Sequence, residues 1–259
     1  RHNEEWLQRL IHKHPTCIPM DQVEPGLPEL VPVCMELPLS SGYLDNLLMT
    51  AEGDIVIVEV KLFANQQARR EVVAQALDYA SSLFSMDYAA LENAVLKSDF
   101  DGKDRPASLY DVFGNADTLD EPAFVDAVNK NLKNGRIVVL VIGDGIRSKL
   151  KDLVDGLQSH AGFHFTFALV ELAVFQEAST EDLFVVPRTL VKTRTIERGI
   201  VRIDDQRSEI IAAHEPETPT LEMAQSISSE QFFEAMGERN SELPSVLKSF
   251  IGRLSALGV

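Results

Sequence analysis

The sequence has little of several features that define common protein classes. Its 259 residues include two cysteines, Cys17 and Cys34, too few for a disulfide framework or a cysteine zinc site. No apolar run approaches the ~20 residues needed to cross a bilayer. The opening RHNEEWLQRL also lacks the apolar core of a signal peptide. We therefore expect a cytoplasmic protein, in a reducing compartment, with no membrane segment.

Positive charge is scarce as well. The chain has 24 Lys and Arg against 40 Asp and Glu, for a formal net charge of −16. A chain this acidic does not attract polyanions through bulk charge, so a nucleic-acid function needs a local binding site. Ten acidic and two basic residues lie between Asp204 and Glu242. This stretch predicts an acidic linker at 204–227, a candidate for docking a protein partner, followed by a C-terminal helical region at 228–259.

What the sequence does contain is an alternation of helical and strand patterns. The hydrophobic fraction of 45% is ordinary for a globular protein, and the chain is long enough to bury a sizeable core. The apolar spacing predicts helices at 3–13, 66–84 and 147–158, and strands at 31–39, 42–50, 54–62, 136–146 and 164–176. This order predicts an α/β or α+β fold around one mixed sheet, with a helical, irregular insertion at 85–134.

The most informative stretch is SGYLDNLLMTAEGDIVIVEVK, which predicts a hairpin with charged residues on otherwise apolar strands. Residues two apart in a strand point to the same face, so Glu59 and Lys61 are expected to project together. A three-residue turn at 51–53, with Gly53 left-handed, would place Asp45 directly opposite Glu59. A two-residue turn would shift this pairing by one residue.

Two directly opposed carboxylates lie close enough to share one divalent cation, because their Cβ atoms are about 4.5–5.5 Å apart. Such a pair is costly to bury unless a cation or a proton compensates the repulsion. Asp45, Glu59 and the backbone carbonyl of Val60, together with waters, suit Mg²⁺ or Mn²⁺. The ion would polarise a phosphoryl oxygen and activate a bound water, and Lys61 would orient that water or stabilise the developing charge. This set is chemically complete for phosphodiester hydrolysis.

These residues resemble the motif of the PD-(D/E)XK nuclease superfamily, which has the restriction-endonuclease-like fold. Asp45 precedes Glu59-Val60-Lys61, and the following helix carries Gln75-Ala76-Leu77-Asp78-Tyr79, similar to the QxxxY signature of the RecB-like branch. Leu44 stands where the eponymous proline would be, but that proline has no role in metal binding. The resemblance covers roughly residues 3–84, and the elements at 136–176 would complete the same sheet within a domain of residues 1–177.

The resemblance implies a nuclease that depends on Mg²⁺ or Mn²⁺ and acts on nucleic acid, with DNA favoured by family analogy. It implies that Asp45 and Glu59 bind the metal and that Lys61 is the catalytic lysine. It also implies that Gln75 and Tyr79 support the site or contact the substrate.

An acidic residue on the first helix is a further part of the resemblance. Glu4 matches the acid that many members supply from this position. Glu4 lies three residues before Leu7 on the apolar stripe of the helix, so Glu4 rather than Glu5 is expected to face the sheet. Glu36, on the strand before Asp45, is a reserve candidate.

Basic residues gather in the predicted β extension at 178–203. Between Arg188 and Arg202 there are five basic residues and one acidic residue, Glu197. All five basic residues occupy even positions: Arg188, Lys192, Arg194, Arg198 and Arg202. On an extended chain without a bulge they would share one face, which would suit a phosphate backbone. Arg69 and Arg70, at the start of the QxxxY helix, would add to this surface.

Less specific interpretations of the same residues stay open. Glu59 and Lys61 are also compatible with an ordinary ion pair on a solvated strand, and Gln75 and Tyr79 with helix packing. On the same fold, the chain could be a non-catalytic binding or scaffold module. A third interpretation is a small-molecule phosphate enzyme that uses Gly143-Asp144-Gly145 at a helix start, although an isolated GxG is more typical of a plain turn.

Overall fold

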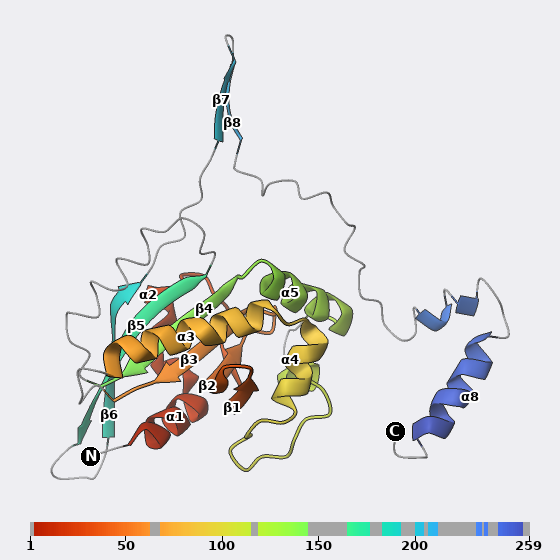
Figure 1. Cartoon of the computed structure of the whole chain (residues 1–259), viewed down its shortest axis with the longest axis horizontal. Coiled ribbons are helices and arrows are strands. Elements are labelled where there is room, and N and C mark those ends of the chain that lie inside the picture. Colours follow the sequence, from red (N-terminus) through yellow and green to blue (C-terminus); the bar gives the residue numbers. More distant parts are fainter. Residues whose placement is uncertain are drawn as a thin grey trace.

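A mixed six-stranded sheet forms the centre of the fold (Figure 1). The computed structural model describes residues 3–62, 68–114, 119–144, 165–176, 183–192, 200–204, 207–211, 232–234, 236–237 and 243–255. The strands of the sheet are β1 (Val31–Leu39), β2 (Gly42–Met49), β3 (Ile55–Val60), β4 (Ile137–Gly143), β5 (Thr166–Gln176) and β6 (Leu183–Lys192). Neighbours in the sheet follow this same order. The pairs β3–β4 and β4–β5 are parallel, and the other pairs are antiparallel.

The central strands β3 and β4 are buried along their whole length. Parallel strands covered on both faces read as continuous apolar runs, and IVIVEV and IVVLVIG fit this rule. Glu59 is the one charged residue in these two strands. Burial of a carboxyl group at this position costs free energy unless a partner compensates it.

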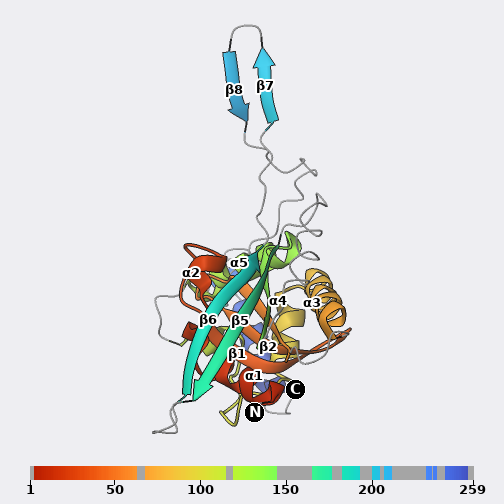
Figure 2. The same ribbon diagram turned by 90° about the vertical axis from the view of Figure 1, so that its left-hand side faces the viewer.

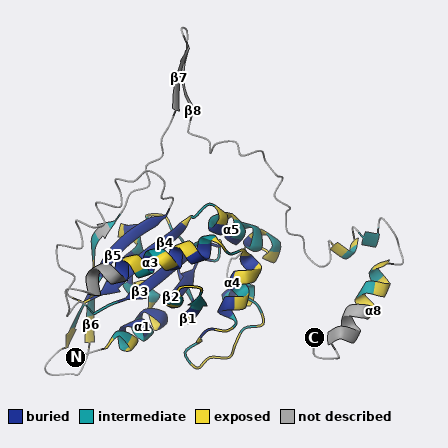
Figure 3. Ribbon diagram, viewed as in Figure 1, coloured by how far each residue is buried: buried dark blue, intermediate teal, exposed yellow. Residues whose placement is uncertain are grey.

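Helices cover both faces of the sheet. One face is covered by α1 (Glu4–Lys13), the 3₁₀ turn η1 (Pro15–Cys17) and α2 (Met20–Val23), and the other by α3 (Ala68–Phe84), α4 (Tyr88–Val95), the 3₁₀ turn η2 (Tyr110–Phe113) and α5 (Glu121–Lys133). Figure 2 shows α2 and α3 on opposite sides of the sheet. Alternate residues of β3 divide between two apolar clusters: Ile55 and Ile57 face α3, while Val56 and Val58 face α1. Figure 3 shows how the buried residues concentrate in and around the sheet.

The predicted helices and strands of the sheet domain are confirmed to within a few residues at each end, where they lie in the described part of the chain. The α1 helix begins as its sequence indicates, because the Asn3 side chain accepts a hydrogen bond from the Trp6 N–H at 2.9 Å. The predicted helix at 147–158 lies outside the described residues.

The segment predicted as an insertion contributes to the core of the domain. Within residues 85–134, α4 and α5 belong to the connection between β3 and β4, and Leu91, Phe124 and Leu132 are fully buried in the cluster with α3. Their apolar spacing is that of core helices, because the second face of the sheet needs cover beyond the reach of α3.

The C-terminal part corrects one predicted boundary. Strands β7 (Ile200–Asp204) and β8 (Arg207–Ile211) form an antiparallel hairpin. The linker predicted from residue 204 is therefore wrong at its start, because Arg207-Ser208-Glu209-Ile210-Ile211 alternates polar and apolar residues well enough to pair with β7. Residues 212–231 lie outside the described residues, and α8 (Leu243–Ser255) falls in the predicted helical region.

Candidate functional site

The turn between β2 and β3 sets the register that the site requires. Gly53 has φ +88°, and Thr50 and Asp54 close the turn through the Thr50 N–H, which donates to the Asp54 carbonyl at 3.1 Å. The strands then pair Asn46 with Val58. Continued by one residue, this register places Asp45 across from Glu59, as the three-residue turn predicts.

Asp45 lies where β2 and β3 cease to pair. The ladder ends at Asn46 and Val58, and beyond it the Asp45 carboxylate replaces the missing strand contact. Its Oδ2 accepts a hydrogen bond from the Val60 N–H at 2.6 Å. One carboxylate oxygen of Asp45 is therefore bound to the backbone of β3, immediately beside Glu59.

Glu59 is a buried carboxyl group inside the sheet, and the nearby Lys61 charge offsets only part of its pKa shift. Its residue is 4% exposed, and its Oε2 has no hydrogen-bond partner among the described residues. Burial, followed by repulsion from Asp45, raises the pKa of Glu59 to about 9. Burial also raises the pKa of Asp45 to about 6, although the hydrogen bond from Val60 opposes this shift. The two carboxyl groups therefore resist ionisation side by side, because burial removes both from water and each negative charge repels the other.

Glu4 connects the first helix to the end of β3. Its Oε2 lies 3.0 Å from the Lys61 Nζ in an ion pair, and its Oε1 accepts a hydrogen bond from the Leu62 N–H at 3.1 Å. The neighbouring Glu5 instead pairs with Arg9 at 3.4 Å along the helix. The structure thus places Glu4, and not Glu5, at the site, and the Lys61 charge lowers the pKa of both Asp45 and Glu59.

Gln75 and Tyr79 contact the start of β2 rather than the two carboxylates. The Gln75 Nε2 donates to the Tyr79 hydroxyl at 2.7 Å, and that hydroxyl donates to the Tyr43 carbonyl at 2.9 Å. Burial raises the pKa of Tyr79, and the negative charges of Glu59 and Asp45 add to the effect. Gln75 and Tyr79 therefore support the backbone at the edge of the site.

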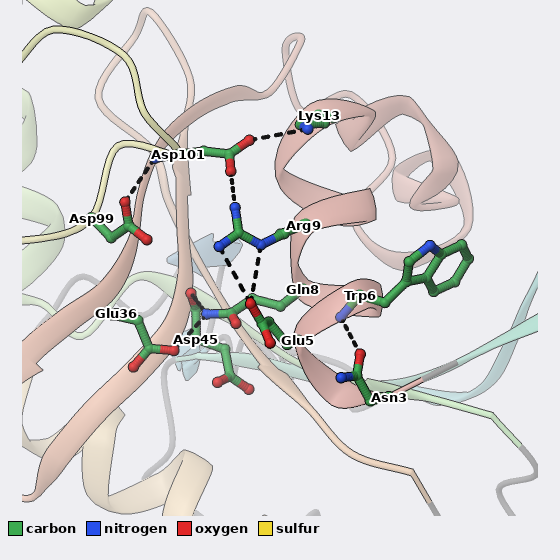
Figure 4. Close-up of polar contacts among 10 residues, drawn as sticks. All are labelled: Asn3, Glu5, Trp6, Gln8, Arg9, Lys13, Glu36, Asp45, Asp99 and Asp101. Atoms are coloured by element: carbon green, nitrogen blue, oxygen red, sulfur yellow. Dashed lines mark hydrogen bonds and ion pairs between the residues drawn. The ribbon is translucent and has the colours of Figure 1, made fainter. Parts of the chain in front are cut away.

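Gln8 is a residue of the site that the sequence analysis missed. Its Nε2 donates to the Glu36 Oε1 and to the Asp45 carbonyl, each at 2.8 Å (Figure 4). The strand register places Glu36 across from Asp45, and Glu36 has a left-handed backbone with φ +51°. One signal was available: Gln8 lies four residues after Glu4 and therefore on the same side of α1.

The donor set of this site is limited. Among the described residues, no group of three or more His, Cys, Asp or Glu side chains is arranged to hold a metal ion. Asp45 and Glu59 nevertheless fit a hard cation by their chemistry, because a buried oxygen of the Glu59 carboxyl has no hydrogen-bond partner among the described residues. Any cation bound here would rely on two carboxylates, a backbone carbonyl such as that of Val60, and waters.

The predicted basic surface does not share one face. A bulge in β6 shifts the register between Leu169 and Val170 of β5. Arg188 therefore pairs across from Glu171 and contacts it at 3.5 Å, whereas Lys192 reaches the Val23 carbonyl of α2 on the other side of the sheet. The prediction of a common face is wrong for these two residues, because a bulge reverses the alternation of side chains.

The remaining basic candidates are only partly described. Arg194 and Arg198 lie outside the described residues, and Arg202 lies in β7. Arg69 and Arg70 lie in the first turn of α3. The side chains of Arg69, Arg70 and Arg202 are not among those described.

Comparisons of the chain with protein-family models, with curated proteins and with solved structures return no match. Within the described helices, none is long and apolar enough to span a membrane.

Proposed function

We propose that the protein is a metal-dependent nuclease with the restriction-endonuclease-like fold, acting on DNA. The observation that carries this proposal is the buried Glu59 carboxyl, whose Oε2 has no partner among the described residues and which lies beside Asp45. The element order supports the fold assignment: a helix, an antiparallel three-stranded unit, and a helix that leads to parallel strands.

Asp45, Glu59 and the Val60 carbonyl would hold the cation. A bound Mg²⁺ or Mn²⁺ would supply a Lewis acid for a phosphoryl oxygen and lower the pKa of a bound water. The protein's own contribution is position and charge. The Val60 N–H holds Asp45 in place, and the buried strand holds Glu59 beside it.

Lys61 provides the positive charge of the site. Its ion pair with Glu4 keeps the ammonium group at the end of β3, where it would orient the attacking water or stabilise negative charge on the phosphate. The side chains of Lys61 and Glu4 are 30% and 43% exposed, so the pair is open to a substrate that competes for the ammonium group.

A cleavage assay tests this proposal. The full chain is incubated with plasmid and with a single-stranded oligonucleotide, in Mg²⁺, in Mn²⁺ and in EDTA. We expect cleavage that requires the cation and that falls at least about 100-fold in Lys61→Ala and in Asp45→Ala, since electrostatic groups of this kind contribute that much. Lys130→Ala, on the exposed face of α5, is the matched control and should cleave normally. Equal cleavage by Lys61→Ala and the wild type would refute the proposal.

A second candidate, a non-catalytic nucleic-acid-binding or scaffold module on the same fold, has one observation in its favour. The described residues offer two converging carboxylates rather than a cluster of three metal ligands. This module would bind nucleic acid without cleaving it, and Mn²⁺ would not raise its melting temperature. A stabilisation by Mn²⁺ that Glu59→Gln removes therefore favours the nuclease.

A further inference from the structure

Tyr43 is an exposed aromatic residue on the strand that carries Asp45. It is 63% exposed, although it lies two residues before Asp45 near the start of β2. Two residues along a strand span about 7 Å, which is within the size of one nucleotide. Tyr43 and Asp45 are alternate residues of β2, and alternate residues of a strand project to the same side.

The backbone beneath the Tyr43 ring is firmly held. The Tyr79 hydroxyl donates to the Tyr43 carbonyl at 2.9 Å, and Gln75 fixes that hydroxyl. Gly42 has φ +140°, and a Cβ atom there would lie 3.2 Å from the Tyr79 hydroxyl, so the chain passes close to α3.

Serine side chains anchor the same turn. The Ser40 and Ser41 hydroxyls both contact the Ser82 hydroxyl of α3, at 2.9 Å and 3.1 Å. The segment that presents Tyr43 is therefore tied to α3 on both sides of Gly42. An aromatic ring on a preorganised support loses little entropy when it binds, which is what a recognition contact requires.

We infer that Tyr43 is a stacking platform for one unpaired base of the nucleic acid, so that the site takes single-stranded or locally opened substrate. This inference rests on the proposed nuclease function. Every base has a flat π face that can stack on an aromatic ring, whereas the bases of an intact duplex are covered by their neighbours. Stacking also suits a chain with a net charge of −16, because it does not depend on bulk electrostatic attraction.

The inference assigns a function to the two residues of the QxxxY pattern. Gln75 and Tyr79 act as positioning residues, because their hydrogen bonds end on the Tyr43 backbone. Their loss would move the ring relative to Asp45 without removing a group that contacts the cation.

The test is binding without cleavage. Fluorescence anisotropy in EDTA at low salt measures the affinity of the full chain for a labelled single strand of about 12 nucleotides, a usual site size, and for the matching duplex. We expect Tyr43→Ala to weaken single-strand binding about tenfold and to leave duplex binding unchanged. Tyr43→Phe keeps the ring and should bind as the wild type does. Phe184→Ala removes a ring of β6 that is 54% exposed, and it is the matched control.

Several outcomes would overturn the inference. Single-strand binding by Tyr43→Ala that equals the wild type would do so, as would an equal loss on duplex and single strand. A loss in Tyr43→Phe as large as in Tyr43→Ala would assign the contact to the hydroxyl instead of the ring. If Tyr43→Ala binds normally, the wild type cleaves and Glu59→Gln does not cleave, the stacking inference fails and the nuclease proposal stands. A wild-type protein that neither binds nor cleaves nucleic acid contradicts both.

Discussion

Replacement of Glu59 by Gln should stabilise the protein when no metal is present. The folded protein raises the pKa of this carboxyl to about 9, from an ordinary value of 4.5. A folded-state pKa above the unfolded value means that the folded state binds the proton more tightly. The contribution of this group to the free energy of unfolding is therefore greatest at low pH. It falls as the pH rises above 4.5 and levels off once the folded-state pKa is passed. The isosteric amide of Gln needs no proton and avoids this loss.

The size of the effect follows from the shift. At pH 7 the carboxyl is ionised in the unfolded state and protonated in the folded state. Keeping it protonated lowers the free energy of unfolding by about 1.4 kcal/mol for each unit of pH above 4.5. The free energy of unfolding of Glu59→Gln at pH 7 should therefore exceed that of the wild type by up to about 3 kcal/mol. The largest gain applies if Asp45 is ionised and repels Glu59 fully. For a domain of this size, the melting temperature should rise by roughly 6–12 °C.

Urea denaturation in EDTA at pH 4 and at pH 7 measures this gain. At pH 4 the wild type and Glu59→Gln should differ little, because the carboxyl is mostly protonated in both states. At pH 7 the variant should be the more stable protein. Glu52→Gln, in the exposed turn of the same hairpin, is the matched control and should show no such dependence on pH. A variant that is no more stable than the wild type at pH 7 would refute the account of Glu59 as a buried carboxyl with a raised pKa.

Three further predictions follow from the same contacts. Mn²⁺ at about 100 times its dissociation constant should stabilise the wild type by about 2.7 kcal/mol, as measured by melting curves, and should not stabilise Glu59→Gln. Glu4→Gln breaks a half-exposed ion pair with Lys61, so it should change the free energy of unfolding by at most about 1 kcal/mol while reducing the cleavage rate. An unchanged cleavage rate would show that Glu4 has no function in the site. Gly53→Ala should lower the free energy of unfolding, measured by urea denaturation, by about 1–2 kcal/mol. The reason is that Gly53 has φ +88° and that a Cβ atom there would lie 3.1 Å from the side chain of Ala127. An unchanged free energy of unfolding would contradict the turn geometry.

Local rules account for the parts of the site that could be predicted. The Gly53 turn sets the hairpin register, and the register decides that Asp45 meets Glu59. Helical spacing distinguishes Glu4 from Glu5 in the same way. These predictions succeed because the period of the strand and of the helix relates each side chain to its near neighbours in the sequence.

The parts that could not be predicted depend on contacts between distant segments. The bulge near Leu190 in β6 is a property of its pairing with β5, and it separates Arg188 from Lys192 although both occupy even positions. The bond from Gln8 to Glu36 joins α1 to β1, and no local pattern marks an isolated glutamine as a bridge. Likewise, the packing of α4 and α5 on the sheet makes a region predicted as an insertion part of the core.

The central claim is that Asp45 and Glu59 hold a cation for cleavage of a phosphodiester bond, with Lys61 as the positive group beside them. It is tested most directly by measuring Mn²⁺ binding and single-strand cleavage on the same samples of wild type and Lys61→Ala. The account predicts that Lys61→Ala still binds Mn²⁺ and loses cleavage by at least about 100-fold. Cleavage by Lys61→Ala at the wild-type rate, or a wild type that binds no Mn²⁺, would contradict it.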